Sequence, residues 1–579
     1  MSRRDGIRRR LKKTGGRGRK LRGLWILLHP YRGRVLLMLG ALLLGTAAAL
    51  APAPLAQRAI DDGIRAKDES TLVVIVIAFV ISALIVWGTS AAQTTLTNWV
   101  GQRALQDLRK QILQHLQSMP VSFYDRRPAG VLISRMTNDV EALNSMVTDS
   151  VTTLIQSSLM LVGSTVILLA FDVKLALLTF LVLPIMGIGS LLCRIASADA
   201  FGRTRETIGA LTAQLQETVS GMRVVRTFAR ERDHLEDFDV LNLDNRAANQ
   251  TTVYLNASYF PLVELISAAT TVLILLYGGA QVLDGALTIG VLVGFIAALG
   301  GFFDPINQLS QVYTTYQSGM AALDKIFELL DEEPQLVDRP DAVALPRPLA
   351  GSVEFDHVTF GYQHRDGLPP AIVDLSLKIE PGETIALVGE TGAGKSTFAK
   401  LIARFYDPDS GRVLVEGHDL RDVQVDSLRS QMGIVPQEGF LFSGTLRENV
   451  AFASRSGDDA EVERVCRAAG AWDFISALPE GLDTQIGERG IQLSAGQRQL
   501  VAFARALAAD PRILILDEAT SNVDLHTETK IEEGIKELLA GRTSVIIAHR
   551  LSTIRQASRI VVLEHGRVVA NGDPETVGN

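Results

Sequence analysis

Eight consecutive residues in the second half of the chain have the types and spacing of a loop that holds phosphate groups. In order, they are Gly389, Glu390, Thr391, Gly392, Ala393, Gly394, Lys395 and Ser396. They fit the pattern G-x-x-x-x-G-K-[ST], in which glycines let backbone N–H groups turn toward phosphate oxygens. Lys395 can place a positive charge beside the β- and γ-phosphates, and Ser396 can offer a hydroxyl to Mg²⁺. The loop therefore predicts binding of a nucleoside triphosphate together with Mg²⁺.

The segments on either side of this loop agree with that interpretation. Residues 384–388 form an apolar, β-rich run. Residues 397–406 carry apolar side chains at helical spacing and begin with Thr397, a further candidate contact for the nucleotide. A strand, a glycine loop and a helix in this order place the phosphates at the positive end of the helix dipole. A glycine loop that arises by chance would need neither neighbour.

Two adjacent acids follow another apolar strand further along the chain. Residues 513–516 are Ile-Leu-Ile-Leu, and Asp517 and Glu518 come directly after them. At the end of such a strand, Asp517 is placed to bind Mg²⁺. Glu518 is then the candidate general base that orients the attacking water. Two solvated acids at a strand end are the alternative, and the phosphate loop upstream argues against it.

The composition shows that these residues occupy only one part of the chain. The 579 residues exceed one ordinary domain, and 47% of them are hydrophobic. The first half contains six apolar runs that are long enough to cross a bilayer about 30 Å thick. A buried helix of a soluble protein is the alternative for any one run, but six in one half-chain argue against it. The predicted spans are residues 35–57, 71–95, 151–171, 173–193, 259–283 and 287–303.

Charge placement predicts how these spans are oriented. The segments 101–148 and 194–250 are long and basic, whereas the segment 61–69 is short and mostly acidic. Basic segments stay on the cytoplasmic side of a membrane, so both long segments and both chain ends are expected there. Both long segments also keep helical periodicity. The membrane helices are therefore predicted to continue well into the cytosol.

Composition also limits the partners of the chain. Residues 1–22 are dense in arginine and lysine, which leaves three interpretations: a nucleic-acid arm, a signal peptide or a membrane flank. No short apolar stretch with an A-x-A site follows, which argues against a signal peptide. A cytoplasmic flank that touches anionic lipid fits best, with residues 24–31 as an interfacial helix, so no nucleic-acid partner is expected. The two cysteines, Cys193 and Cys466, are too far apart for a disulfide framework or a zinc site.

A second domain of soluble character follows a linker. Residues 331–350 are polar and rich in proline, and a new pattern begins at Gly351. Strands alternate with helical patterns there, which is typical of an α/β domain with a parallel sheet. The strands are expected at residues 353–355, 384–388, 433–435, 513–516 and 544–547. The predicted domains are a basic N-terminus with an interfacial helix (1–34), a six-helix membrane domain (35–330), a linker (331–350) and a nucleotide-binding domain (351–579).

One further motif distinguishes this chain from other proteins with the same phosphate loop. The residues Leu493-Ser494-Ala495-Gly496-Gln497 open a helical pattern that runs to Ala508. They resemble the signature sequence of ATP-binding cassette (ABC) transporters, which is usually L-S-G-G-Q. Nearly the whole chain, with six spans, two long cytosolic segments and one nucleotide-binding domain, resembles bacterial half-transporters of the exporter type.

The resemblance implies a role for the signature residues. Ser494, Ala495, Gly496 and Gln497 are expected to bind the γ-phosphate of an ATP that another cassette holds. Ala495 stands where the family has glycine, and its methyl group would be strained if this position needs a positive φ. Each ATP then needs the phosphate loop of one cassette and the signature of another. The resemblance therefore implies a dimer with two ATP sites.

The resemblance also assigns residues around the phosphate loop. Gln437 matches the glutamine that contacts Mg²⁺ and water, and His549 matches the histidine that holds the attacking water. Tyr362 matches the aromatic residue that stacks on adenine. An ordinary loop or core role is the alternative for each of them. The implied metal ligands are Ser396, Gln437 and Asp517, and the implied catalytic residues are Lys395, Gln437, Glu518 and His549.

Several segments resemble the interface and docking loops of exporters. Residues 521–524 match the interface loop, in which Asn522-Val523 stands where the family more often has Ala-Leu. Plain helix surface is the alternative for the docking loops. The segments that resemble docking loops are 487–490, 123–125 with 135–140, and 221–228.

These observations predict a membrane ATPase that exports a substrate from the cytosol with ATP and Mg²⁺. It is expected in the bacterial inner membrane, among lipid, with both termini and the ATPase domain in the cytoplasm. Its partner is expected to be a different half-transporter rather than a second copy, because Ala495 and Asn522-Val523 resemble the hydrolysing half of heterodimeric exporters. The apolar spans fit a drug, a lipid or another apolar or amphipathic molecule. The polar candidates in or near the spans are Gln156, Glu264 and Gln281.

Three other classes of protein need to be separated from this one. A soluble cassette protein of DNA repair or translation would share the ATP site but not the six spans. An importer would lack the fused domain order and the long cytosolic segments. An ATP-gated channel or a regulatory membrane ATPase would keep every motif. Transport against a gradient in vesicles distinguishes an exporter from the last class.

Overall fold

The computed structural model divides the chain into two compact units, which are described one at a time. The first unit contains Met1–Gln114 and Leu132–Glu332, and the second contains His115–Val131 and Glu333–Asn579. The structure describes residue 25 and residues 28–362, 369–437, 439–454, 457–487, 490–517, 525–548 and 551–573.

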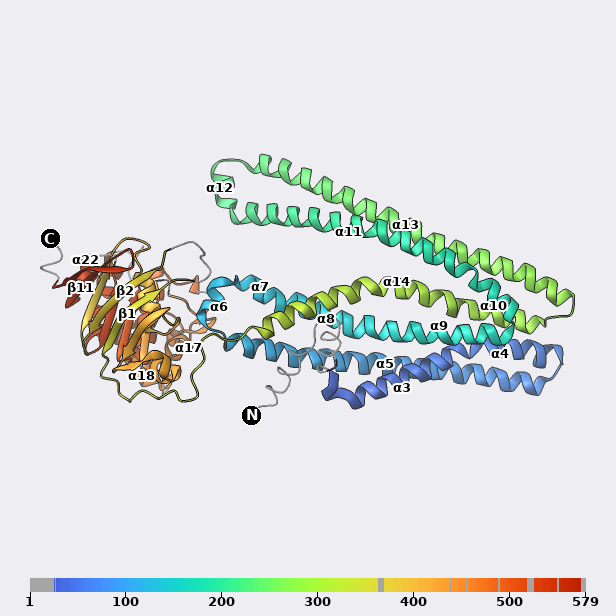
Figure 1. Cartoon of the computed structure of the whole chain (residues 1–579), viewed down its shortest axis with the longest axis horizontal. Helices are drawn as coiled ribbons and strands as arrows, with labels where there is room; N and C mark the ends of the chain where they lie inside the picture. The colour runs from blue at the N-terminus through green and yellow to red at the C-terminus, as the bar shows by residue number, and fades with distance from the viewer. Residues whose placement is uncertain are drawn as a thin grey trace. The chain divides into compact units, whose positions relative to one another are not determined.

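The first unit consists of helices, several of which are much longer than the roughly 20 residues that cross a bilayer (Figure 1). α5 has 49 residues, α13 has 53 and α14 has 43, so the prediction of helices that extend beyond the spans is confirmed. In chain order the helices are α3 (Arg32–Leu50), α4 (Pro52–Arg58), α5 (Glu69–Gln117), α7 (Ala129–Ser134), α8 (Val140–Ser145), α9 (Val151–Phe171), α10 (Val173–Phe180), α11 (Val182–Ser220), α12 (Met222–Thr227), α13 (Glu231–Leu283) and α14 (Ile289–Asp331). Wider π-helical turns lie at Ala59–Arg65, Arg135–Asp139 and Met146–Ser150.

Five stretches of the described chain are long and apolar enough to cross a membrane, and they correspond to five of the six predicted spans. The fourth predicted span, 173–193, falls on α10 and the start of α11, where the apolar stretch Val173–Gly189 is shorter. Of the interfacial helix predicted at residues 24–31, the structure describes a 3₁₀ turn, His29–Tyr31. The five stretches are His29–Arg65, Glu69–Gln117, Ala129–Phe171, Glu231–Leu283 and Ile289–Leu309.

Polar side chains fix the turns between neighbouring spans. Asp172 lies between α9 and α10 and accepts a hydrogen bond from the backbone N–H of Leu175 (2.8 Å). Thr288 caps α14 by accepting one from the N–H of Val291 (3.2 Å). The Thr288 hydroxyl in turn donates to Asp61 (2.5 Å). The acidic segment predicted between the first two spans therefore holds the start of the last one.

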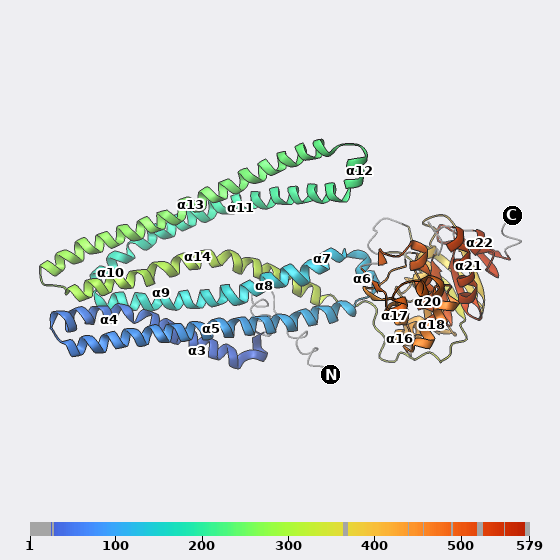
Figure 2. The same cartoon turned by 180° about the vertical axis from the view of Figure 1, so that it is seen from behind.

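The helices of this unit pack as antiparallel pairs. α11 and α13 lie side by side and are joined by α12 at their tip, as Figures 1 and 2 both show. α9 packs on α14 in the same way. Phe295, Phe302 and Phe303 of α14 are at most 3% exposed and lie in the core of the unit. The second predicted docking segment thus forms the tip of a long helical hairpin.

The second unit is the predicted α/β domain. Its six-stranded sheet has the order β12-β11-β3-β10-β9-β6 and is parallel except for β12, and a four-stranded antiparallel sheet has the order β2-β1-β4-β5. All five predicted strands are present. The strands are β1 (Val353–Phe360), β2 (Ile372–Ile379), β3 (Thr384–Val388), β4 (Ser410–Val415), β5 (His418–Asp419), β6 (Met432–Val435), β7 (Gly444–Thr445), β8 (Gln485–Ile486), β9 (Ile513–Asp517), β10 (Thr543–Ile547), β11 (Arg559–Glu564) and β12 (Arg567–Gly572).

Two hydrophobic cores stabilise this unit. One lies between the antiparallel sheet and α15, where Phe355 stacks on Phe398 with 4.2 Å between ring centroids. The other lies among α17, α18 and α20, which Figure 2 shows on the same side as α21. The helices are α6 (Val121–Arg126), α15 (Lys395–Ile402), α16 (Val425–Arg429), α17 (Leu446–Ala451), α18 (Asp459–Ala468), α19 (Trp472–Ser476), α20 (Ala495–Ala508), α21 (Leu525–Leu539) and α22 (Leu551–Ile554).

Part of the predicted linker is packed into the second unit. Leu345 and Leu349 are 5% and 2% exposed and belong to its core. The backbone N–H of Leu349 donates to the side-chain oxygen of Gln431 (3.0 Å). Two leucines among prolines make no periodic pattern, so the composition did not reveal this packing. Residues 115–131, which were predicted inside the membrane domain, likewise cluster with the second unit.

The helix after the phosphate loop is shorter than predicted. α15 ends at Ile402, whereas the apolar spacing predicted a helix to Tyr406. Arg404 has a φ of +47°, which is incompatible with a continuing right-handed helix. Its guanidinium is buried and donates to the carbonyl oxygen of Val423 (2.8 Å). This turn directs the chain toward α6, where the Tyr406 hydroxyl donates a hydrogen bond to Asp125.

Candidate nucleotide-binding site

The phosphate loop joins β3 to α15, as predicted. Gly389 and Gly394 have φ values of 155° and 106°. A Cβ atom on Gly389 would lie 2.2 Å from the carbonyl oxygen of Leu563, and one on Gly394 would lie 2.6 Å from that of Ala371. Only glycine fits both positions. The loop is therefore a backbone cradle, and the carbonyl groups of Leu563 and Ala371 pack against its outer side.

Lys395 occupies the inside of this cradle. Its side chain is buried, and its ammonium donates to the carbonyl oxygens of Gly389 (2.6 Å) and Glu390 (3.0 Å). Ser396 is exposed and Thr397 is buried in the first turn of α15. Phosphate oxygens carry charge and make stronger hydrogen bonds than neutral carbonyls, so they can replace these two acceptors. The loop fits a triphosphate.

The parallel sheet brings the other predicted residues to the same edge. On β10, Ile547 lies beside Leu387 of β3 on one side and beside Asp517 of β9 on the other. Val435 of β6 pairs with the residue before Asp517, and Gln437 follows Val435 by two positions. The carboxyl ends of neighbouring parallel strands meet at one edge, where ligands of such sheets bind. The edge therefore combines the phosphate loop, Asp517 and Gln437.

Several site candidates lie outside the described residues. Glu518 follows the last residue of β9, and His549 comes shortly after the end of β10. The interface loop 521–524 and Glu488-Arg489 of the segment 487–490 are also outside. Their roles stay predictions.

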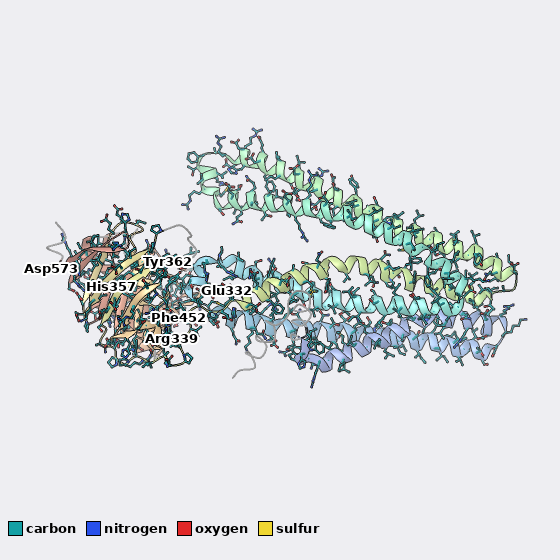
Figure 3. The ribbon with its side chains drawn as sticks, in the orientation of Figure 1. Glu332, Arg339, His357, Tyr362, Phe452 and Asp573 are labelled. Carbon is teal, nitrogen blue, oxygen red and sulfur yellow. The ribbon has the colours of Figure 1, made fainter. Side chains whose placement is uncertain are left out.

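Tyr362, labelled in Figure 3, follows β1 and is half-buried beside α15. Its ring packs edge-to-face against Phe360 and Tyr406, with centroid distances of 5.1 and 5.3 Å. Its hydroxyl lies 3.1 Å from the Thr397 hydroxyl. The ring is thus held beside the residues that open the helix of the phosphate site, a position suited to stacking on a base.

Tyr362→Ala is expected to raise the Kd for ATP about tenfold, because stacking of a base on an aromatic ring contributes about 1–3 kcal/mol. The maximal ATPase rate should fall much less, because the ring does not contact the reacting phosphate. Tyr362→Phe is the matched control, since it keeps the ring and loses only the contact with Thr397. Titration with a fluorescent ATP analogue measures both variants. Equal losses in the two would assign the effect to the hydroxyl instead of the ring.

The signature residues form the start of α20. The Ser494 hydroxyl accepts a hydrogen bond from the N–H of Gln497 (3.2 Å), and the Gln497 side chain accepts one from the N–H of Ser494 (2.9 Å). Ser494 and Ala495 are exposed, whereas Gly496 is buried. Ala495 is the first residue of the helix, so its backbone is right-handed and its methyl group is unstrained. This helix start can receive an anion with alanine in place of glycine.

Comparison with known proteins identifies the family. Residues 35–306 match the model of the ABC transporter transmembrane region, and residues 372–521 match the ABC transporter model. An uncharacterized ABC transporter ATP-binding protein of Bacillus subtilis, YknV, is 39% identical over 557 residues, which cover 95% of this chain and 91% of the relative. The chain belongs to the ABC transporter family.

Two further comparisons define the kind of ABC transporter. An ATP-dependent lipid A-core flippase of Syntrophus aciditrophicus is 38% identical over 95% of this chain and 91% of its own length. A solved structure of a bacterial Atm1-family ABC exporter with ATP bound is 30% identical, with a TM-score of 0.78 over 94% of this chain and 96% of the other. The predicted fold and class are confirmed. The chain is an exporter half-transporter that acts as a dimer in a membrane and couples ATP hydrolysis to transport.

The first predicted docking segment, 123–125 with 135–140, is divided between the two units: residues 123–125 lie on α6 in the second unit, and residues 135–139 form a π-helical turn in the first. The second-unit part, α6, contacts α15 through Asp125 and Lys400. Phe123 is 1% exposed, and Asp125 accepts hydrogen bonds from Lys400 (3.2 Å) and from the Tyr406 hydroxyl (2.6 Å). The sequence did not single out Lys400 or Tyr406. The position of Lys400 on the helix that follows the phosphate loop is the one feature of the sequence that could have indicated it.

A membrane span of the exporter also contains an acid that the sequence pattern did not indicate. Asp304 lies on α14 inside the apolar stretch Ile289–Leu309 and is exposed. The predicted span ended at residue 303, one position before it. Gln308 lies one turn further on the same face and accepts a hydrogen bond from Ser157 of α9 (2.8 Å). A polar layer therefore crosses the helical unit at this level.

Proposed function

We propose that this exporter moves an amphipathic molecule, a drug or a lipid, out of the cytosol. The observation that carries the proposal is the polar layer among apolar spans. Gln93 donates to Gln156 (3.4 Å), Ser157 donates to Gln308 (2.8 Å), and Asp304 is exposed on the same helix face as Gln308. Polar and ionisable side chains within membrane spans mark substrate pathways, because lipid disfavours them. A wholly apolar cargo would need none of them.

The relatives support a lipid-like cargo in a general way. Several of them are named lipid A-core flippases, and that substrate is theirs. For this chain we propose the broader class, with Glu264 of α13 as a second polar contact, since its side chain is exposed within a predicted span. Both Glu264 and Asp304 are acidic residues, which favours cargo with a polar or cationic group over a phosphate.

We propose roles for the residues of the ATP site that the sheet edge and the family resemblance support. Lys395, Thr397 and the loop N–H groups bind phosphate oxygens, and Tyr362 stacks on adenine. The hydroxyl, amide and carboxylate oxygens of Ser396, Gln437 and Asp517 form a set suited to Mg²⁺. Bound Mg²⁺ supplies charge that stabilises the transferred phosphoryl group. Glu518 takes the proton of the attacking water, and His549 holds that water in place.

The proposed dimer would cover two apolar surfaces that one chain leaves exposed. At the tip of the α11–α13 hairpin, Val224 and Phe228 are 60% and 71% exposed. On the second unit, Phe440, Phe442 and Phe452 form an aromatic cluster with exposures of 50%, 46% and 66%. Phe452 is labelled in Figure 3. Exposed apolar groups of this size favour burial in an interface. We propose that α12 of one half docks on such a cluster of the other.

We propose a different half-transporter as the second half, with both termini and both basic segments in the cytoplasm. Asn522-Val523 supports this pairing because it departs from the family's usual interface loop. Because the backbone of Ala495 is helical, the signature of this chain can bind the γ-phosphate of the ATP that the partner holds. Because Glu518 and His549 are both present, this chain should hydrolyse ATP at its own phosphate loop.

The test is ATPase activity and transport of the chain in lipid vesicles. We expect no activity for the chain alone, and ATP-driven movement of a fluorescent cationic lipid or a cationic dye against its gradient after co-expression with a neighbouring half-transporter. Robust activity of the chain alone would establish a homodimer instead. Movement that only runs down the gradient, with ATP merely opening the path, would replace the exporter with a channel.

A further inference from the structure

One lysine connects the first docking segment with the helix of the phosphate loop. The ammonium of Lys400 on α15 lies 3.2 Å from Asp125 of α6, and both side chains are about two-thirds buried. Lys400 lies on the helix that begins with Lys395. Partial burial strengthens such a pair relative to a fully exposed one. A shift of α15 relative to its surroundings therefore changes the distance between Lys400 and Asp125, and so the force on α6.

The same lysine lies against the adenine candidate. Its ammonium is 5.8 Å from the ring centroid of Tyr362 and 5.9 Å from that of Tyr406, within the range of a cation–π contact. The Tyr362 hydroxyl meets Thr397, which lies three residues before Lys400 on the same face of α15. Tyr362 is thus held by two residues of the helix that begins the phosphate site.

Tyr406 keeps the acid of α6 in place. Burial, and then the hydrogen bond to Asp125, raise the pKa of the Tyr406 hydroxyl. The hydroxyl therefore stays protonated at neutral pH and donates to the carboxylate (2.6 Å). Asp125 thus accepts from the neutral hydroxyl of Tyr406 and from the cation of Lys400, which also lies against two aromatic rings. Lys400 contacts both Asp125 and the ring of Tyr362, so it can pass a change at that ring to α6.

We propose that Lys400 and Asp125 transmit the binding of adenine at Tyr362 to the first docking segment. The proposal rests on the proposed role of Tyr362. A base that stacks on the ring competes with Lys400 for its face, so the ammonium is left with Asp125 and their ion pair tightens. α6 is then held to the cassette that has bound a nucleotide. Lys400 is a positioning residue, because it acts through Tyr362 and Asp125.

The relay predicts that phosphates alone are an incomplete signal. Inorganic tripolyphosphate can occupy the phosphate loop and engage Lys395 and Thr397, but it offers no ring to Tyr362. It should therefore leave the Lys400–Asp125 pair as it is without ligand. ATP should tighten the pair and change the membrane helices to which α6 is joined through α5 and α7.

The experiment measures the response of the membrane half at saturating ligand. A single cysteine replaces Ala297 on the exposed face of α14, in a Cys193→Ala, Glu518→Gln protein in lipid vesicles with its partner half. Cys466 does not interfere, because it is buried and burial raises its thiol pKa to about 12. The readout is the labelling rate with a membrane-impermeant maleimide, and a fluorescent ATP analogue verifies occupancy.

The protein that carries only the Ala297→Cys, Cys193→Ala and Glu518→Gln changes is the parent. We expect ATP to change its labelling rate about tenfold. When Lys400→Met or Asp125→Asn is added to the parent, ATP should change the rate less than about twofold. Tripolyphosphate should give the parent the same small response. Lys400→Arg keeps the cation and should keep the full response. Lys378→Met is the matched control, because it removes another cassette lysine with an ion pair, to Glu380 at 2.8 Å, and should leave the response intact.

The outcomes separate the relay from the proposed function. A parent that does not respond to ATP contradicts the proposed function itself. A responding parent with an equal response in Lys400→Met at equal occupancy overturns the relay, as does an equal response of the parent to tripolyphosphate. If Lys400→Met fails to bind the analogue, Asp125→Asn decides, since Asp125 lies outside the ATP site: a full response in that variant overturns the relay.

Discussion

Replacing Glu518 with glutamine is expected to lower ATP turnover about 10²–10³-fold, because a positioned general base contributes about 10²–10⁴ to such a rate. Glutamine has nearly the same size but neither the charge nor the basicity of the carboxylate. Binding of ATP should stay close to that of the parent, since the phosphate loop and Tyr362 are unchanged. The variant should therefore accumulate in an ATP-bound state.

Turnover and equilibrium binding of ATP, measured on the same preparation, check this expectation. Glu564→Gln is the matched control, because Glu564 is an exposed acid at the end of β11 in the same parallel sheet. Its turnover should equal that of the parent. Unchanged turnover in Glu518→Gln would remove Glu518 from catalysis, and equal losses in both variants would indicate a general charge effect.

The sequence predicted those parts of the fold whose signals are local. Apolar runs near 20 residues predict spans, and short β-rich runs between helical patterns predict a parallel sheet. The site edge was accessible for the same reason. Asp517 and the phosphate loop each follow such a run, and the sheet order β3-β10-β9 brings the ends of those runs together.

The missed features depend on contacts between distant residues or on one residue in a window. Asp125 and Lys400 are separated by 275 positions, and no periodicity encodes their pairing. Asp304 is a single acid among apolar neighbours, so the predicted span was ended just before it. Leu345 and Leu349 sit among prolines and become core residues only through Gln431 and the sheet behind them.

Gly394→Ala is the second change with a large expected effect: the Kd for ATP should rise at least about 100-fold, a cost near 2.7 kcal/mol. A non-glycine residue at a φ of 106° is strained by about 1–3 kcal/mol. The added Cβ would also lie 2.6 Å from the carbonyl oxygen of Ala371 and 2.9 Å from Cδ1 of Ile372. The loop must shift to relieve these close contacts. Because Lys395 directly follows Gly394, the shift would also move the lysine that binds the phosphates.

Gly417→Ala separates the two causes. Gly417 has a φ of 72° in the turn between β4 and β5, and a Cβ there would meet no atom within 4 Å. Gly417→Ala should lower the Tm only through the strain of a non-glycine residue at a positive φ. It should leave the Kd for ATP unchanged. Thermal unfolding and ATP binding of both variants measure the difference. If Gly394→Ala bound ATP as well as Gly417→Ala does, the close approach of Ala371 would not shape the cradle, and the charge of Lys395 would have to account for phosphate binding.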